Sequence, residues 1–216
     1  KKKERTQYQR FKKLELNEKK TFDLYKLSKQ TNIDFAVTPF DSNFIKFLSK
    51  YVTFFKIASG DIDYIPLLEE ISKYNKPVVL STGMSDINRI KIATKILNQN
   101  KLILLHCISS YPTKESEANL NCLDKLKNNF NCVIGQSDHT NDIYVPLLAV
   151  ANGAKIIEKH FKINNMKCAD APVSIDQYQM KRMITEIRRI EKIFGKDNLG
   201  IRASEKNIKS FRRFTH

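Results

Sequence analysis

Short apolar segments with the composition of β-strands recur along the chain, and a segment with helical spacing of apolar residues follows each one. Their centres fall near residues 37, 57, 80, 104, 134 and 157, and no hairpin turn joins two of them. The strands are apolar on both faces, as in a parallel sheet covered by helices. The pattern predicts an α/β protein with six β/α units. We expect strands over residues 35–38, 54–59, 77–82, 102–107, 132–135 and 155–161, and helices over residues 17–31, 42–50, 64–74, 85–98, 119–128, 141–152 and 175–194.

A doubly wound sheet and a (β/α)8 TIM barrel both fit this alternation. The barrel is favoured because no G-x-G-x-x-G motif follows the first strand, and because a polar residue ends every strand, as around a barrel's active site. A complete barrel needs eight strands, so we expect an incomplete one: two strands precede residue 1, or the barrel is completed in another way. The polar strand-end residues are Thr38, Ser59, Ser81, Thr82, Ser109, Ser137, His139, Glu158 and His160.

The composition is that of a globular domain. The chain has 216 residues, of which 41% are hydrophobic and 28% charged, and its longest apolar runs are far shorter than the ~20 residues that span a membrane. The four cysteines show no C-x-x-C spacing, and two of them lie in apolar strands, so we expect reduced thiols and a cytoplasmic protein without a membrane partner. We divide the chain into a basic segment (1–16), a barrel domain (17–200) and a linker (201–216).

The formal charge of +15 raises the question of an anionic partner such as nucleic acid. The basic residues are spread over many expected helices, and basic motifs interleaved with aromatic residues are lacking. The one dense cluster, residues 1–13, is interpreted as a solvated chain end. We therefore expect no nucleic-acid partner.

Two histidines lie at the ends of the last two expected strands, His139 after the first and His160 at the end of the second. His139 and His160 are separated by 21 positions (160 − 139) but would lie at the same edge of a parallel sheet. Two imidazoles with carboxylates nearby are compatible with a divalent metal site. The alternative is a pair of buried histidines whose nitrogens are satisfied by hydrogen bonds.

Hydroxyl groups and one lysine end several strands. Lys56 lies inside an apolar strand, where its charge is costly unless an anion or a carboxylate pairs with it. Several hydroxyl donors around one ammonium group suit a phosphate, although each hydroxyl taken alone is more commonly bonded to backbone. A Schiff-base lysine is a further possibility. The hydroxyl residues expected at this mouth are Thr38, Ser59, Ser81, Thr82 and Ser137.

Six motifs occur in an order that resembles the sialic acid synthase family, over residues 33 to 195. They are the segments VTPFD at 37–41, KIASGD at 56–61, LSTGM at 80–84, HC at 106–107 with YPT at 111–113 and NL at 119–120, GQSDHT at 135–140, and EKHF at 158–161. The family includes N-acetylneuraminate, legionaminate and pseudaminate synthases.

The resemblance implies a condensation of phosphoenolpyruvate with an N-acetylmannosamine-like aldose, giving a nine-carbon 2-keto acid and phosphate. It implies that His139 and His160 hold a divalent metal, commonly Mn2+ with Mg2+ or Co2+ as alternatives, which polarises the sugar aldehyde. C3 of phosphoenolpyruvate attacks that carbon, water adds at C2, and phosphate leaves by C–O cleavage. Positions matching phosphoenolpyruvate contacts are Thr38, Lys56, Ser59, Ser81 and Ser137, with Ser109 at a position that is Asn in some members; those near the sugar are Tyr111, Glu158 and Asp170.

The resemblance also shows what this chain lacks. Family members begin with two strands that carry a Glu and a Lys, and they end in a small antifreeze-like domain that reaches the partner's site in a homodimer. Neither end is present here, so we expect weak turnover from this chain alone. Two alternatives remain: a binding module that has lost catalysis, and a phosphoenolpyruvate-dependent synthase of seven- or eight-carbon keto sugar acid phosphates. The residues Gly60 and Asp61 favour a neuraminate or legionaminate precursor over a pseudaminate precursor.

Overall fold

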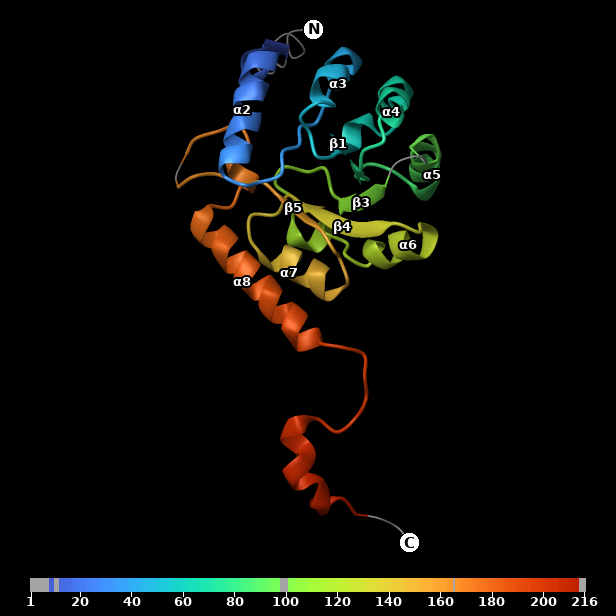
Figure 1. The fold of residues 1–216 in the computed structure, drawn as a ribbon, viewed down its shortest axis with the longest axis vertical. Helices are drawn as coiled ribbons and strands as arrows, with labels where there is room; N and C mark the ends of the chain where they lie inside the picture. Colours follow the sequence, from blue (N-terminus) through green and yellow to red (C-terminus); the bar gives the residue numbers. More distant parts are fainter. Residues whose placement is uncertain (1–7, 10–11, 98–100, 165, 214–216) are drawn as a thin grey trace.

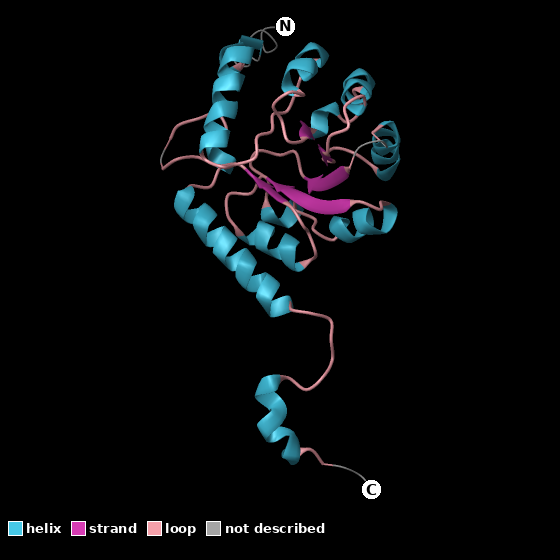
Figure 2. Ribbon diagram, in the orientation of Figure 1, coloured by secondary structure: helices cyan, strands magenta, loops and turns pink. Residues whose placement is uncertain are grey.

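The computed structural model describes residues 8–9, 12–97, 101–164 and 166–213. Strands and helices alternate along the described chain, with the helices packed around the outside of one curved sheet (Figure 1, Figure 2). The strands are β1 (Phe55–Ile57), β2 (Val78–Ser81), β3 (Leu102–Cys107), β4 (Val133–Asp138) and β5 (Ile157–Lys159). The α-helices are α2 (Glu18–Gln30), α3 (Ser42–Leu48), α4 (Ile65–Ser72), α5 (Ile87–Ile96), α6 (Cys122–Asn129), α7 (Tyr144–Ala151) and α8 (Gln177–Phe194), and the 3-10 helices are η1 (Ser59–Asp61), η2 (Glu115–Glu117), η3 (Ala171–Val173) and η4 (Ala203–Phe211).

The order of the strands distinguishes the two architectures. All neighbouring strands are parallel, and their order in the sheet is β1-β2-β3-β4-β5, without the reversal that defines a doubly wound sheet. Lys56 on the first strand lies 3.7 Å (Nζ to Oε2) from Glu158 on the last. In a flat sheet these two strands would be about 19 Å apart, four interstrand spacings of ~4.8 Å. The sheet therefore curls around its own interior, and the expected incomplete TIM barrel is confirmed.

Local sequence signals explain where the helices begin. Asn17, Asp41, Asp86 and Asp176 each accept a hydrogen bond from a backbone N–H in the first turn of the helix that follows. Asp176 and Gln179 form a reciprocal capping box at the start of α8. These caps fix the points at which each strand-end loop turns into its helix.

The core lies between the sheet and the surrounding helices. All four residues of β2 are buried, and Val78 and Leu80 pack with buried apolar residues from the helices, which is why the strand reads as an apolar run. The largest fully buried side chains are Phe55, Ile45, Leu48, Ile57, Leu67, Leu68, Ile71, Leu80, Leu97, Leu104, Leu105 and Leu123.

The strand expected over residues 35–38 is wrong: this segment is extended but is not part of the sheet. Its backbone meets the segment before β1 through one hydrogen bond, from Thr53 N–H to the Phe35 carbonyl at 2.9 Å. Pro39, which ends the segment, has no N–H to donate. Phe35 and Val37 nevertheless pack against the core, so the apolar pattern indicated burial correctly and pairing incorrectly. The described sheet consequently has five strands where six were expected.

The last two strands also differ from expectation. The strand expected to end at Gly135 continues to Asp138, because its residues pair with β3 on one side and with β5 on the other. The strand expected over 155–161 is confined to three residues, 157–159. The two functional histidine candidates therefore come directly after regular strands.

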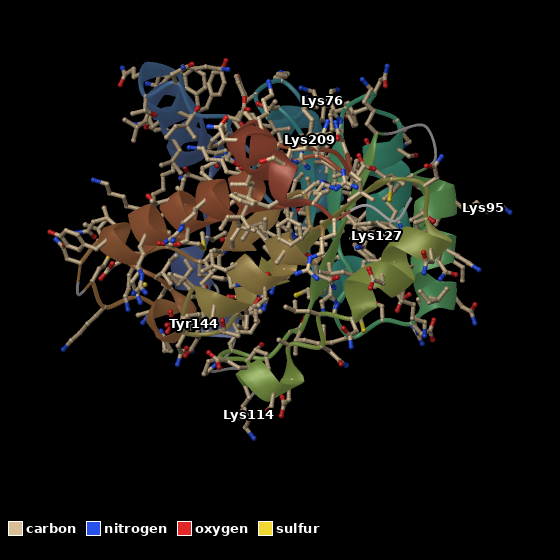
Figure 3. All side chains as sticks on the ribbon, turned by 90° about the horizontal axis from the view of Figure 1, so that it is seen from below. Lys76, Lys95, Lys114, Lys127, Tyr144 and Lys209 are labelled. Atoms are coloured by element: carbon tan, nitrogen blue, oxygen red, sulfur yellow. The ribbon has the colours of Figure 1, made fainter. Side chains whose placement is uncertain are left out.

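The chain ends and the surface carry most of the basic charge. Of the basic segment 1–16, residues 1–7, 10 and 11 lie outside the described part of the chain. Figure 3 shows Lys95 and Lys114 projecting outward from different parts of the surface. The segment after α8 extends away from the β/α body and carries η4 (Figure 1). Among the described helices, none combines the length and apolarity that a membrane span requires.

Candidate active site

The register between β4 and β5 organises the site. Ser137 lies opposite Glu158, and Asp138 lies opposite Lys159. The next position on each strand is a histidine, and the imidazole rings of His139 and His160 have their centroids 5.2 Å apart. Successive side chains of a strand point to opposite faces. The Ser137–Glu158 and His139–His160 pairs therefore share the interior face of the sheet, at its carboxyl edge.

Both histidines are oriented by a partner on the same ring atom. Nδ1 of His139 lies 2.8 Å from the carbonyl oxygen of Ile108, and an imidazole can only donate to a carbonyl, so this nitrogen carries the proton. Nδ1 of His160 lies 3.6 Å from Oδ2 of Asp170. Such contacts leave Nε2 of each ring as the nitrogen free to accept, which is how protein metal ligands are commonly held.

Tyr111 covers the two imidazoles. Its ring centroid lies 4.1 Å from that of His139 and 5.6 Å from that of His160. Burial, with help from the negative charges nearby, raises the pKa of Tyr111 to about 12. The phenol therefore stays protonated and can donate a hydrogen bond across the physiological range.

Burial and neighbouring groups shift the pKa values of the two histidines in opposite directions. Burial lowers the pKa of His160, and the neighbouring His139 lowers it further. Burial alone would lower the pKa of His139 as well, but its contacts with Cys107 and the Ile108 carbonyl together raise it. His160 is thus held in the neutral form that a metal ligand requires.

A chain of polar contacts connects the two edges of the sheet across the interior. The Ser137 hydroxyl donates to Oε1 of Glu158 at 2.6 Å, and Oε2 of Glu158 lies 3.7 Å from Nζ of Lys56. Lys56 donates in turn to Ser81 Oγ at 2.9 Å and to the carbonyl of Ile57 at 3.0 Å. Burial lowers the pKa of Lys56, while Glu158 opposes that shift. The lysine expected in the mouth is therefore there, paired loosely with a carboxylate.

Gly83 brings two further hydroxyls close to this cluster. Its N–H donates to Ser59 Oγ at 3.0 Å. A Cβ at this position would lie 2.9 Å from Ser59 Oγ and closer still to Ser109 Oγ, so only glycine allows this approach. Ser109 Oγ is also 3.9 Å from the Cys107 sulfur. Ser59 and Ser109 thus lie at the same mouth as Lys56 and the histidines.

Two of the expected hydroxyl residues are less involved. Thr82 donates to the carbonyl of Leu105 at 3.0 Å and so serves the backbone. Within the described residues no hydrogen bond joins Thr38 to the cluster, and Thr38 belongs to the segment that did not form a strand. The structure therefore brings together every other residue expected at the site: Lys56, Ser59, Ser81, Ser109, Tyr111, Ser137, His139, Glu158, His160 and Asp170.

The donor set fits a divalent metal held by two protein ligands. His139 and His160 face one another with Nδ1 of each occupied or approached by an oxygen. Among residues 8–9, 12–97, 101–164 and 166–213, no cluster of three or more His, Cys, Asp or Glu side chains is placed to hold an ion. Further coordination positions would therefore belong to water or to a substrate.

Comparison with known proteins decides which family has this arrangement. The model of the NeuB family matches residues 1–198 of the chain. The chain belongs to the NeuB family. Residues 1–198 include every strand of the sheet and all the site residues.

Curated members of the NeuB family resemble the chain closely. An uncharacterized protein of Methanocaldococcus jannaschii is 45% identical over 93% of this chain and 61% of its own length. The N,N'-diacetyllegionaminic acid synthase of Campylobacter jejuni is 38% identical over 96% of this chain and 65% of its own length. The chain thus spans less than two thirds of the length of either relative.

Solved structures share the fold of this chain. The N-acetylneuraminic acid (sialic acid) synthetase of Leptospira borgpetersenii, in complex with citrate, has a TM-score of 0.87 and 39% identity, covering 92% of this chain and 71% of that one. A truncated 3-deoxy-D-arabino-heptulosonate 7-phosphate synthase from Thermotoga maritima has a TM-score of 0.75 at 18% identity, a likeness of fold alone. Homologues of this NeuB chain are thus named as sialic, legionaminic and pseudaminic acid synthases.

Sequence reasoning missed three residues of the site. Cys107 was interpreted as a buried thiol, yet its sulfur lies 3.8 Å from Nδ1 of His139. Gly83 was noted only as part of the motif LSTGM at 80–84. Asp61 has a buried Oδ2 without a hydrogen-bond partner among the described residues, and burial raises its pKa against the opposing influence of Lys56. Cys107 ends β3 and Gly83 follows β2 by two residues, so their positions near strand ends carry the available signal, but a glycine or a thiol there has many other uses.

Proposed function

We propose that the chain carries the core of an active site that condenses phosphoenolpyruvate with an N-acetylated amino sugar. The products are a nine-carbon 2-keto acid and phosphate, formed with addition of one water. The observation that carries this proposal is the placement of a lysine, several hydroxyls and two facing histidines around one carboxylate, Glu158. The family relationship supports the reaction class.

Lys56 would bind the anionic end of phosphoenolpyruvate. Its side chain is nearly buried and its carboxylate partner is 3.7 Å away, beyond a good hydrogen bond, so the ammonium group keeps capacity for another anion. The hydroxyls of Ser59, Ser81 and Ser137 supply donors around it. Thr38 remains part of the proposal as a residue of the same mouth.

His139 and His160 would hold a divalent metal, with manganese as the first candidate and magnesium or cobalt as alternatives. When bound, the metal supplies Lewis-acid polarisation of the sugar aldehyde. The chain's own contribution is to orient the two rings, because the Ile108 carbonyl and Asp170 each approach Nδ1 and leave Nε2 toward the ligand. Tyr111 packs over both rings, shields them from water on one side and keeps its phenolic proton.

Glu158 would take part in proton transfer. Its carboxylate accepts from Ser137 and approaches Lys56, so it lies where the phosphate-bearing carbon and the attacking water would be held. A carboxylate at this point can take the proton of the water that adds at C2. Loss of phosphate from that carbon then leaves the keto group.

The proposal extends to the assembly and its setting. We propose a homodimer in the cytoplasm as the working form, with phosphoenolpyruvate and the amino sugar as small-molecule partners. A neuraminate or legionaminate precursor is the preferred sugar, since the chain has Gly60 and Asp61 after Ser59. A second candidate is a ligand-binding module without turnover.

A titration tests the proposal. Calorimetry of the chain with Mn2+, with and without phosphoenolpyruvate, should show metal binding that His139→Ala and His160→Ala abolish. Cys168→Ser, which removes an exposed thiol, is the control for metal bound at sulfur and should bind as the parent chain does. Unchanged Mn2+ binding in both histidine variants would contradict the metal assignment.

Product analysis separates the two candidates. Phosphate and 2-keto acid released from phosphoenolpyruvate with N-acetylmannosamine or a diacetylated analogue would establish catalysis. Ligand binding without either product would favour the binding module.

A further inference from the structure

A buried ion pair lies between the two functional pairs of the β4–β5 ladder. Asp138 and Lys159 are directly opposite each other in the register, one position after Ser137–Glu158 and one position before the histidines. Because side chains alternate along a strand, the ion pair points away from the mouth while its neighbours point into it. Its two side chains are only 2% and 1% exposed.

Asp138 is bonded on both oxygens. Oδ2 accepts from Lys159 Nζ at 2.6 Å and from the Thr140 hydroxyl at 2.8 Å. Oδ1 accepts from the Thr140 N–H at 3.3 Å and from Gln136 Nε2 at 3.2 Å. Lys159 also donates to the carbonyl of Thr140. The pair therefore ties β5 to the backbone immediately after His139, and not only to a side chain.

The neighbouring structure makes this tie important. In the described sheet β5 has β4 as its one strand neighbour, and three residue pairs form that ladder. A slip of one position would move every side chain of β5 to the other face. A buried ion pair is weak support for overall stability, because desolvation offsets its attraction, but a matched charge pair opposes any other register.

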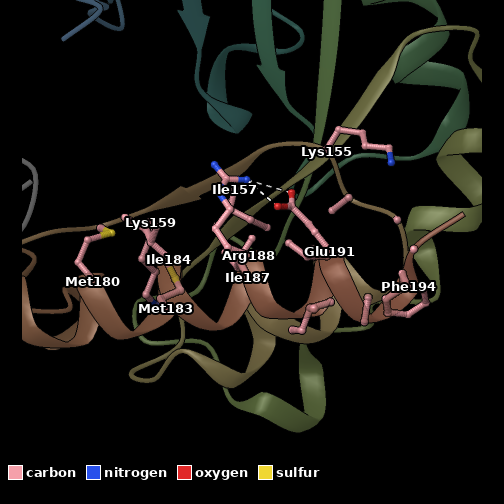
Figure 4. Close-up of a pocket in the computed structure, with 16 residues that line it drawn as sticks. Lys155, Ile157, Lys159, Met180, Met183, Ile184, Ile187, Arg188, Glu191 and Phe194 are labelled. Carbon is pink, nitrogen blue, oxygen red and sulfur yellow. Dashed lines mark hydrogen bonds and ion pairs between the residues drawn. The ribbon is translucent and has the colours of Figure 1, made fainter. Parts of the chain in front are cut away.

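Helix α8 lies beside Lys159 on the outer side of β5. The stem of Lys159 lines a groove of about 740 Å3 between β5 and α8, together with Met180, Met183 and Ile184 (Figure 4). These apolar neighbours cannot stabilise an unpaired ammonium group. The charge of Lys159 therefore has Asp138 and the Thr140 carbonyl as its partners in this environment.

We propose that Asp138 and Lys159 are positioning residues that hold His139 opposite His160 and Ser137 opposite Glu158. The inference rests on the proposed function, because the histidine pair is taken as the metal site. Loss of the pair lets β5 shift against β4 and separates the two imidazoles, even where the chain stays folded.

The test is the double substitution Asp138→Asn with Lys159→Met, which removes both charges and avoids leaving one of them buried alone. Asn retains an oxygen for the Thr140 N–H. Lys155→Met, an exposed lysine lining the same groove, is the matched control. The readouts are Mn2+ affinity by calorimetry, the unfolding transition in urea, and amide hydrogen exchange of residues 157–160.

We expect the double variant to unfold cooperatively, to bind Mn2+ about 10- to 100-fold more weakly, as for other groups that orient metal ligands, and to exchange its β5 amides faster. Lys155→Met should match the parent chain in all three. A folded double variant with unchanged affinity and unchanged exchange would overturn the proposal. Should that variant not fold, Thr140→Val removes one hydroxyl contact with Asp138 and should lower the affinity about two- to ten-fold; an unchanged affinity overturns the proposal equally.

Failure of the proposed function gives a different result. A parent chain that binds no Mn2+ would refute the metal site, while faster β5 exchange in the double variant would still support the role of the ion pair in strand register. Unaltered exchange together with normal metal binding by the parent chain would refute the ion-pair role alone.

Discussion

Lys159 and Lys56 each reach a carboxylate on another strand, and the two pairs differ in depth and closeness. Lys159 and Asp138 are 2.6 Å apart with side chains 1% and 2% exposed, whereas Lys56 and Glu158 are 3.7 Å apart with side chains 12% and 41% exposed. The first pair lies between the sheet and its helices. The second spans the interior of the curled sheet from β1 to β5.

The difference shows which lysine is committed to the fold. Lys159 has its charge fully matched by Asp138 and a backbone carbonyl, so it has no capacity for a ligand. Lys56 bonds Ser81 and the Ile57 carbonyl and meets its carboxylate only loosely. The same residue type thus stabilises strand register on one face and remains available for an anion on the other.

The largest expected effect is on the free energy of unfolding, after a substitution in the buried Asp138–Lys159 pair. Lys159→Met leaves the Asp138 carboxylate buried without its counter-charge, and we expect the free energy of unfolding to fall by about 3–5 kcal/mol. Urea denaturation measures the change. Lys155→Met should alter the unfolding free energy by less than about 0.5 kcal/mol. A similar small loss at Lys159 would mean that the two pairs do not differ as described.

The same lysine-to-methionine substitution in the Lys56–Glu158 pair should weaken phosphoenolpyruvate binding and leave the free energy of unfolding nearly unchanged. Lys56→Met removes a charged donor worth about 1.5–3 kcal/mol, so affinity for phosphoenolpyruvate should fall about 10- to 150-fold in calorimetry. The unfolding free energy should stay within about 1 kcal/mol of the parent, because the buried charge disappears with its cost. Undiminished phosphoenolpyruvate affinity would make Lys56 structural.

A substitution of Glu158 tests whether the carboxylate of the Lys56–Glu158 pair lies next to an anion site. Glu158→Gln keeps an oxygen for the Ser137 hydroxyl but removes a negative charge beside the anion site. We expect phosphate to bind about five-fold more tightly, the effect of about 1 kcal/mol between like charges 4 Å apart in water. Turnover, if Glu158 accepts the proton of water, should be lost in the same variant. Weaker phosphate binding would contradict the placement of Glu158 next to the anion.

The smallest effect concerns pH. The pKa of Lys56 is lower in the folded chain than its ordinary value of 10.5, mainly through burial. Between that lowered pKa and 10.5 the unfolded chain binds more protons at this residue, so its contribution to stability rises with pH. Urea denaturation at pH 7 and pH 10 should show the parent chain gaining stability relative to Lys56→Met. A difference that stays constant with pH would argue against a buried charge.

Much of this arrangement could be predicted from the sequence because it depends on periodicity. The β/α alternation, the parallel sheet and the polar strand ends all follow from where apolar runs stop, and the helices expected from residues 17 and 85 begin within two residues of those positions, after the caps Asn17 and Asp86. The strand over residues 35–38 could not be excluded, because burial of Phe35 and Val37 produces the same apolar pattern as pairing does.

The sequence indicates which residues form the site, but it does not indicate the register in which β4 and β5 pair. His139 and His160 each follow a strand, which the sequence indicates, but their being directly opposite depends on the pairing of β4 with β5. Asp138 and Lys159 looked like ordinary polar neighbours of the histidines. Their burial depends on the pairing of β4 with β5 and on the helices around the sheet, which are contacts between distant segments that no local pattern carries.

The β4–β5 ladder also sets where this gene can change length. The segment from 141 to 154 joins the two strands outside the ladder and the histidine pair, so an added or deleted residue in its loops would leave all the pairs in place. One residue inserted within 136–138 or 157–159 would exchange the two faces of that strand beyond the insertion, bringing one member of the ion pair into the mouth and turning the histidine of that strand toward the helices. Insertions and deletions among functional relatives should therefore be absent from the two strands and confined to the connection.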